Sequence, residues 1–231
     1  MKGVKTLLRS NATMPVAGSL LVVLAVIVGI AVHTGTTSAD DQRVLGEFIE
    51  NRSPWITTWM VFVTNAFSPT STIIISLFVA AAAWLRGRKL ADAGFVVATV
   101  GLASAITFVL KLVFQRGRPP VVDQLIGEFD FSFPSGHTTG VAALAFATAW
   151  VFSTYMRRRW AISLLWAAAA ACVAIVAASR LYLGVHWFTD TIAGACVGVG
   201  VAMLLAAALP AARAWRPQLP EWAAERRIAR H

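Results

Sequence analysis

The chain has 231 residues, of which 58% are hydrophobic and 13% are charged. Because about a quarter of the residues in a soluble domain are charged, this composition excludes an ordinary water-soluble globular protein. The formal net charge of +9 raises the question of a nucleic-acid partner. The basic residues flank apolar segments and carry neither interleaved aromatic residues nor a groove-reading motif, so we exclude that class.

Long apolar segments occupy most of the chain. A bilayer core about 30 Å thick requires about 20 apolar helical residues to cross it. Six segments meet this requirement and are each expected to form a transmembrane helix: residues 15–33, 68–86, 91–114, 137–155, 160–178 and 187–209. The sequence thus predicts an all-α, polytopic membrane protein, organised as a six-transmembrane-helix bundle and one domain over residues 1–231.

The first apolar segment has a second interpretation, as a cleaved secretory signal. Basic residues at 2–9 precede it, and Thr37-Ser38-Ala39 follows it, an arrangement that such signals share. The segment is longer than a typical signal core, and its removal would leave five spans. We therefore expect an uncleaved first helix.

Basic residues gather on one side of the predicted bundle. Of the 20 Lys and Arg residues, 14 lie in four segments that six spans place on the same side: residues 2–9, 86–89, 157–159 and 213–230. We expect the protein to lie in the plasma (inner) membrane. Because Lys and Arg are enriched in cytoplasmic loops, we expect both termini to lie in the cytoplasm. The remaining polar segments then lie on the extracytoplasmic face.

Residues 40–67 form the longest connection, between the first and second predicted spans. Apolar residues between positions 44 and 49 recur at helical spacing, and an aromatic-rich run begins at Pro54-Trp55. This pattern is typical of one or two amphipathic helices on the membrane surface, with Trp at headgroup depth. The segment is either an interfacial belt or a lid over a lipid site, and the sequence leaves both open.

Three short stretches hold most of the polar chemistry, and the last contains Ser179-Arg180, His186 and Asp190. His186 and Asp190 are four residues apart, so on a helix they share a face. Asp190 can then accept a hydrogen bond from one ring nitrogen and leave the other unprotonated, as in a catalytic triad. The alternative is a structural His–Asp pair next to an interfacial arginine.

The middle stretch, Pro134-Ser135-Gly136-His137, opens the fourth predicted helix. Ser135 is a suitable N-cap and Gly136 permits close approach of a ligand to the backbone. Free N–H groups at a helix N-terminus bind anions, and His137 is placed to protonate a leaving oxygen. The alternative is an ordinary turn and cap.

The first stretch ends the third predicted helix. Lys111 and Arg118 are seven residues apart, and Pro119 disfavours helix at Arg118, so Arg118 is expected to turn back toward the site. An arginine can bind phosphate in bidentate fashion, and a lysine acts as a point charge. The alternative is a lysine that extends toward the interface at a helix end. Arg116 matches no motif position and is a weaker candidate for the site.

Together the three stretches resemble the signature of the type 2 phosphatidic acid phosphatase superfamily over about residues 105–200, with no departure at its key positions. The resemblance implies a phosphohistidine mechanism with His186 as nucleophile, Asp190 as its partner and His137 as general acid. It assigns phosphate binding to five residues: Lys111, Arg118, Ser135, Gly136 and Arg180. It also implies turnover without a metal, and two histidines with one carboxylate are indeed a poor ligand set for a hard divalent cation. We expect no metal and no cofactor.

The predicted function is therefore a metal-independent membrane lipid phosphatase acting at the outer face. Polyprenyl diphosphate is the favoured substrate, with phosphatidic acid or phosphatidylglycerol phosphate next. Two other functions stay open: a phosphotransferase that passes the phosphoryl group to another acceptor, and a non-catalytic transporter or flippase of anionic lipids. Lipid phosphates and membrane lipids are the expected partners, nucleic acid is not, and the sequence leaves the oligomeric state open.

Overall fold

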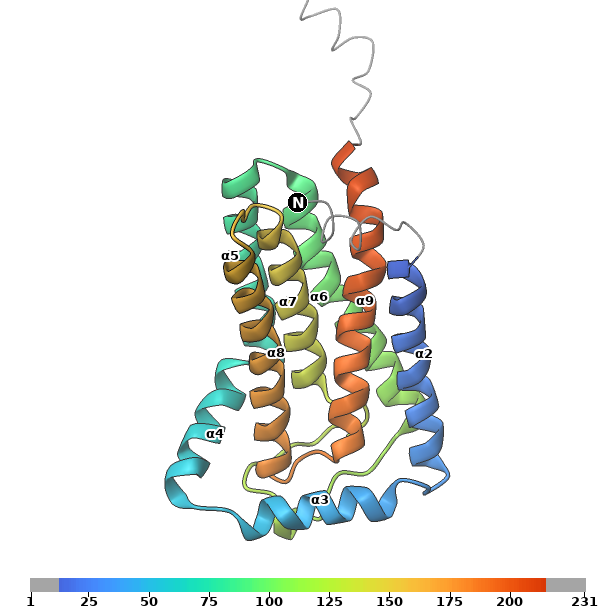
Figure 1. Ribbon diagram of the computed structural model, residues 1–231. Helices are drawn as coiled ribbons and strands as arrows, with labels where there is room; N and C mark the ends of the chain where they lie inside the picture. Colours follow the sequence, from blue (N-terminus) through green and yellow to red (C-terminus); the bar gives the residue numbers. More distant parts are fainter. Residues whose placement is uncertain (1–12, 215–231) are drawn as a thin grey trace, which may run out of the picture.

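The computed structural model describes residues 13–214, and regular structure in this range is helical throughout. The predicted all-α class is confirmed. The helices are α2 (Thr13–His33), α3 (Ser38–Glu50), α4 (Pro54–Ala66), α5 (Pro69–Gly87), α6 (Leu90–Phe114), the short 3-10 helix η1 (Val121–Asp123), α7 (Gly136–Ser153), α8 (Arg159–Tyr182) and α9 (Phe188–Ala214). The long helices run side by side, and α3 lies across their lower ends (Figure 1).

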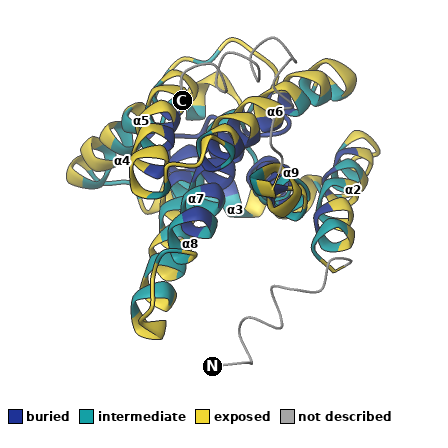
Figure 2. Cartoon of the chain, turned by 90° about the horizontal axis from the view of Figure 1, so that it is seen from above, coloured by how far each residue is buried: buried dark blue, intermediate teal, exposed yellow. Residues whose placement is uncertain are grey.

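Helix α7 lies at the centre of the bundle and packs against α5, α6, α8 and α9. Ten of its 18 residues are buried, and it forms the dark core of the view from above (Figure 2). Helix α9 approaches it closely because position 194 has no side chain. A Cβ at Gly194 would lie 2.7 Å from the carbonyl oxygen of Ser135. This close approach brings the start of α7 beside the start of α9.

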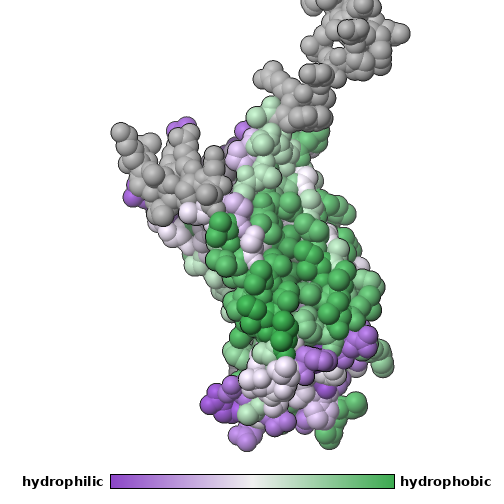
Figure 3. Space-filling model, turned by 90° about the vertical axis from the view of Figure 1, so that its right-hand side faces the viewer, coloured by the Kyte–Doolittle hydropathy of each residue, from purple (hydrophilic) through white to green (hydrophobic). Residues whose placement is uncertain are grey.

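Within residues 13–214, five helices are long and apolar enough to cross a membrane: α2, α5, α6, α8 and α9. The predicted count of six spans is not confirmed: α7 is not among them, since it has only 18 residues and its first turn, Gly-His-Thr-Thr, is polar. Since α7 is enclosed by other helices, it can carry a histidine and several threonines without exposing them to lipid. Hydrophobic residues form a broad band around the middle of the face shown in Figure 3, and hydrophilic residues gather at its lower end.

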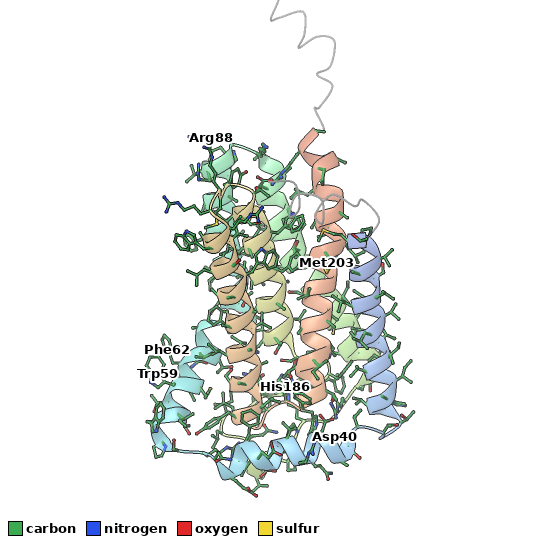
Figure 4. All side chains as sticks on the ribbon, viewed as in Figure 1. Asp40, Trp59, Phe62, Arg88, His186 and Met203 are labelled. Atoms are coloured by element: carbon green, nitrogen blue, oxygen red, sulfur yellow. The ribbon has the colours of Figure 1, made fainter. Side chains whose placement is uncertain are left out.

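The predicted interfacial segment at residues 40–67 contains two helices. Helix α3 buries Asp41 and Leu45. Helix α4 leaves Trp59 and Phe62 exposed, and both point away from the bundle (Figure 4). This arrangement suits helices that lie at the level of the lipid headgroups. A lid function stays a prediction.

Candidate active site

The eight predicted site residues come together at one end of the bundle. They lie in the last turns of α6 and α8, in the two loops that follow those helices, and in the first turns of α7 and α9. His186 lies at the lower end of the helices, just above α3 (Figure 4). Contacts between these segments, given below, place the residues around one point.

His186 and Asp190 form a buried pair. The Nδ1 atom of His186 lies 3.2 Å from Oδ2 of Asp190. His186 precedes α9 rather than lying on it, and the contact forms because Asp190 lies in the first turn of that helix. Because the carboxylate only accepts, Nδ1 carries the proton and Nε2 keeps its lone pair.

The turn between α8 and α9 depends on Gly184. Its backbone has a φ of +68°, and a Cβ there would collide with the carbonyl oxygen of Asp123. The backbone N–H of Trp187 donates to Oδ2 of Asp190 at 2.9 Å. The turn thereby fixes both His186 and the carboxylate that orients it.

Ser132 is a site residue that the sequence did not indicate. Its hydroxyl donates to Oδ2 of Asp190 and lies 3.4 Å from Nδ1 of His186. It is fully buried. Its position three residues before Ser135 carries no pattern of its own, so only the fold could reveal its role in orienting Asp190.

The other nitrogen of His186 faces the cations. Its Nε2 atom lies 3.2 Å from Nη1 of Arg118. Burial, together with the charges of Arg180, Arg118 and Lys111, lowers the pKa of His186 well below its usual value. The imidazole is therefore neutral at neutral pH, as a nucleophile must be.

Two acidic side chains, Glu128 and Asp130, pair with the three predicted phosphate-binding cations. Lys111 Nζ lies 3.0 Å from Oδ2 of Asp130, and the same carboxylate accepts a hydrogen bond from Arg118. Arg180 donates to Glu128. Burial alone would raise the pKa of Asp130, but the nearby charges and hydrogen bonds of Lys111 and Arg118 outweigh it and lower this pKa.

These carboxylates occupy positions that suit the oxygens of a phosphate group. Neither Glu128 nor Asp130 was predicted as a site residue. A cavity of about 360 Å³ lies beside them, lined by Arg118, Pro119, Val121, Gln124, Gly127, Glu128, Phe129 and Asp130. A ligand in this cavity would therefore contact Arg118.

The start of α7 contributes His137. Its Nε2 lies 3.4 Å from Nη1 of Arg180, which links it to the same cation cluster. Ser135 caps the helix, since its hydroxyl accepts from the backbone N–H of Thr138 at 3.5 Å. The backbone N–H of Ser135 donates to the carbonyl oxygen of Asp190 at 3.0 Å, and Gly136 follows as the first residue of the helix.

The end of α6 determines where Arg116 lies. The helix ends at Phe114, as the predicted span of residues 91–114 does, because Gln115 adopts a left-handed conformation with φ of +43°. Arg116 consequently leaves the helix axis. Its guanidinium contacts Asp190 at 2.5 Å and Asp41 at 2.6 Å, so a weaker candidate in the sequence lies directly behind the His–Asp pair.

Metal ligands are not grouped in the part of the chain that the structure describes: no three His, Cys, Asp or Glu side chains lie close enough to hold an ion. The two cysteines, Cys172 on α8 and Cys196 on α9, are free and half-buried. The polar groups at this end instead form a set of cations around a neutral imidazole. Such a set suits phosphoryl transfer.

Comparison with known proteins adds independent information. The PAP2 superfamily matches residues 92–214. The chain is 26% identical over 177 residues to phosphatidylglycerophosphatase B of Bacillus subtilis, covering 75% of this chain and 85% of that protein. It is 28% identical over 155 residues to the putative undecaprenyl-diphosphatase YbjG of Escherichia coli, covering 64% and 70%. The crystal structure of the transmembrane PAP2 type phosphatidylglycerolphosphate phosphatase from Bacillus subtilis shares the fold, with a TM-score of 0.75 at 24% identity over 81% of this chain and 93% of that one.

Proposed function

The chain belongs to the PAP2 superfamily and is a membrane lipid phosphatase, and we propose that it hydrolyses a lipid phosphomonoester or diphosphate through a phosphohistidine at His186. Membership confirms the predicted superfamily and the predicted enzyme class, a metal-independent phosphatase. The observation that carries the proposal is the buried His186–Asp190 pair with Nε2 turned toward Arg118.

In the first step, Nε2 of His186 attacks phosphorus, and the bond from phosphorus to the leaving oxygen breaks. His137, which the negative charge of the bound phosphate keeps protonated, gives that oxygen a proton, and this releases the lipid alcohol or, from a diphosphate, the lipid monophosphate. The cations Lys111, Arg118 and Arg180 neutralise the oxygens of the transferred group. We expect Ser135 and Gly136, at the start of α7, to contact the same phosphate oxygens.

In the second step, water attacks the phosphohistidine, and the bond between phosphorus and Nε2 breaks. His137, deprotonated in the first step, takes the proton of the water. Asp190 holds the Nδ1–H of His186 in both steps, so that Nε2 is the atom that leaves. Phosphate and the starting form of the enzyme result.

Substrate binding requires an exchange of anions. The Asp130 and Glu128 carboxylates pair with the cations in the described structure, so a phosphate group must displace them. A lipid phosphate brings its own negative charge and compensates the cations that the carboxylates leave. We infer that the 119–130 loop moves when substrate binds.

An outward-facing site is the orientation that we propose. The start of α2 and the end of α9 lie at the end of the bundle opposite His186 (Figure 1, Figure 4), and Arg88 lies at that same end. The positive-inside rule assigns that end to the cytoplasm. The site then faces the extracytoplasmic side of the plasma (inner) membrane.

A polyprenyl diphosphate is the substrate that we favour, followed by phosphatidylglycerol phosphate and phosphatidic acid. An outward-facing site suits a diphosphate carrier lipid that is released at the outer leaflet. One similar protein is described as a putative undecaprenyl-diphosphatase and another as a phosphatidylglycerophosphatase, so both classes belong in the test.

Phosphate release by the detergent-purified protein tests the proposal, with EDTA present and with a C55 polyprenyl diphosphate, phosphatidylglycerol phosphate and phosphatidic acid as substrates. We expect release by the wild type and its loss in His186→Ala. The exposed His33 provides a matched histidine control, and His33→Ala should keep full activity. Absence of release from every lipid by folded wild-type protein would contradict the proposal.

Addition of alcohol acceptors to the same assay examines the phosphotransferase alternative. Acceptor-dependent product at the expense of free phosphate would assign a phosphotransferase. The transporter alternative is disfavoured by membership of a phosphatase family.

A further inference from the structure

Arg116 bridges two buried carboxylates that come from opposite ends of the sequence. Its Nη1 lies 2.5 Å from Oδ1 of Asp190, and its Nη2 lies 2.6 Å from Oδ2 of Asp41. The Asp190 and Asp41 side chains are 0% and 1% exposed, and that of Arg116 is 13% exposed. A single guanidinium thus connects the nucleophile's partner with helix α3.

Asp41 is itself fixed to the start of α9. It accepts hydrogen bonds from the backbone N–H of Thr189 at 2.9 Å and from the Thr189 hydroxyl at 2.8 Å. The same hydroxyl accepts from Nη1 of Arg116 at 2.8 Å. The Trp187 ring covers the guanidinium, with its centroid 5.3 Å from Cζ. The arginine therefore has a single well-defined position.

The two oxygens of Asp190 have separate partners. Oδ2 binds the His186 ring, the Ser132 hydroxyl and the Trp187 N–H. Oδ1 binds Arg116. Because one oxygen is held by the arginine, the other stays directed at Nδ1 of His186.

Loss of Arg116 would change the chemistry of the pair. A buried carboxylate without its cation is costly, and the protein can lower that cost by protonating or rotating it. A neutral carboxylic acid no longer enforces the tautomer with the proton on Nδ1. The lone pair of Nε2, which must attack phosphorus, would then be lost in part of the population.

We propose that Arg116 and Asp41 are positioning residues for the nucleophile: they hold Asp190 charged and oriented, and they couple α3 to the active site. This inference rests on the proposed function of His186. Neither residue contacts His137, Lys111 or the phosphate-binding arginines in the described contacts. Their effect should therefore fall on the chemical step and leave phosphate binding unchanged.

The competing explanation is a structural clamp that attaches α3 to the bundle without any effect on catalysis. A matched control distinguishes the two. Arg43 and Asp40 also form an ion pair on α3, at 3.4 Å, but their side chains are 70% and 72% exposed. Arg43→Gln and Asp40→Asn each remove one charge of the same sign as Arg116→Gln and Asp41→Asn do, but from an exposed pair away from Asp190.

The first experiment measures kcat, KM and the inhibition constant of inorganic phosphate in Arg116→Gln, Arg116→Lys and Asp41→Asn. We expect kcat to fall about 10²-fold in Arg116→Gln, the size of effect that a small misplacement of a reacting group causes. Lysine keeps the charge but cannot bridge two carboxylates, so Arg116→Lys should recover part of the loss. KM and phosphate inhibition should stay near wild type, as should every constant of the Arg43→Gln and Asp40→Asn controls.

The second experiment combines Arg116→Gln with Asp190→Asn. If Arg116 acts through Asp190, the double variant is no slower than Asp190→Asn alone. Unchanged kcat per folded molecule in Arg116→Gln, or losses that multiply in the double variant, would overturn the inference. If Arg116→Gln does not fold, Asp41→Asn and Arg116→Lys decide by the same criteria. Inactive wild-type protein would instead contradict the proposed function.

Discussion

Each end of the bundle contains a buried aspartate paired with an arginine, but the two pairs have different surroundings. At the end where α6 begins and α9 ends, Asp92 on α6 accepts hydrogen bonds from Arg213 on α9, at 2.6 Å, and from the Tyr155 hydroxyl. At the opposite end, where α9 begins, Asp190 binds Arg116 and the His186 imidazole. The carboxylates are buried to the same extent, both at 0% exposed.

The two carboxylates differ in whether a neighbouring group can gain or lose a proton near neutral pH. Burial and the hydrogen bond to Asp92 raise the pKa of Tyr155, so the Asp92 cluster keeps one protonation state near neutral pH. The His186 imidazole faces three cations and a nearby cavity. A buried ion pair is therefore a poor sign of function by itself, and a titratable neighbour with access to a ligand is a better one.

Replacement of His186 should have the largest effect on activity. His186→Ala removes the attacking nitrogen, and we expect phosphate release to fall by about 10³-fold or more. Because the ring is buried and paired with Asp190, the variant should also lose stability, so phosphate release is compared per folded molecule. Retained turnover in this variant would place the nucleophile elsewhere.

Neutralising each buried aspartate in turn distinguishes the catalytic end of the bundle from the structural end. Asp190→Asn should lower kcat by about 10³-fold, because an amide can stabilise the wrong tautomer of His186. Asp92→Asn should lower the free energy of unfolding by about 3 kcal/mol, the cost of breaking a buried pair, while kcat per folded molecule stays unchanged. Thermal unfolding and phosphate release, measured on the same preparations, check both expectations. A large loss of kcat in Asp92→Asn would contradict a purely structural role for the Asp92 pair.

Neutralising the acidic loop should strengthen the binding of product. With Glu128→Gln and Asp130→Asn combined, Lys111, Arg118 and Arg180 lose their internal anions. We expect inorganic phosphate to inhibit about 10-fold more strongly, equivalent to about 1.4 kcal/mol. Glu47→Gln on the exposed face of α3 is the control. Weaker phosphate inhibition would mean that the two carboxylates assist binding instead of competing with it.

The pH dependence of kcat/KM reports on His186 in the free enzyme. Because the pKa of His186 is lowered by burial and by the neighbouring cations, the attacking neutral form persists as the pH falls, and the acid limb should lie below the usual pKa of histidine, about 6.5. Arg118→Gln removes one of these cations and should move the limb to higher pH. A limb that moves to lower pH would contradict this assignment of charge.

The sequence predicts the features that depend on local pattern. Apolar length predicts the membrane-spanning helices, and the spacing of His186 and Asp190 predicts their contact. Ser135 is recognisable as a helix cap from its neighbours alone, and the structure confirms that cap. The superfamily resemblance rests on the same short stretches and is also confirmed.

Features that depend on tertiary structure were missed. Asp41 and Thr189 are separated by 148 residues, so no local pattern connects them. In the sequence, Glu128 and Asp130 are indistinguishable from ordinary acidic loop residues, and only the fold shows that they pair with the cations. The enclosure of α7 is likewise a tertiary feature, and it explains how a helix inside a membrane bundle can begin with Gly-His-Thr-Thr.

The central claim is that phosphorus is bonded to His186 during turnover. Rapid quenching of a single turnover, with a lipid substrate labelled at its terminal phosphate, tests it most directly. We predict an acid-labile, base-stable label at residue 186 that persists longer in His137→Ala, where the water lacks its base, and that is absent from His186→Ala. Complete turnover of the labelled lipid without label on His186, or with label on another residue, would contradict the account.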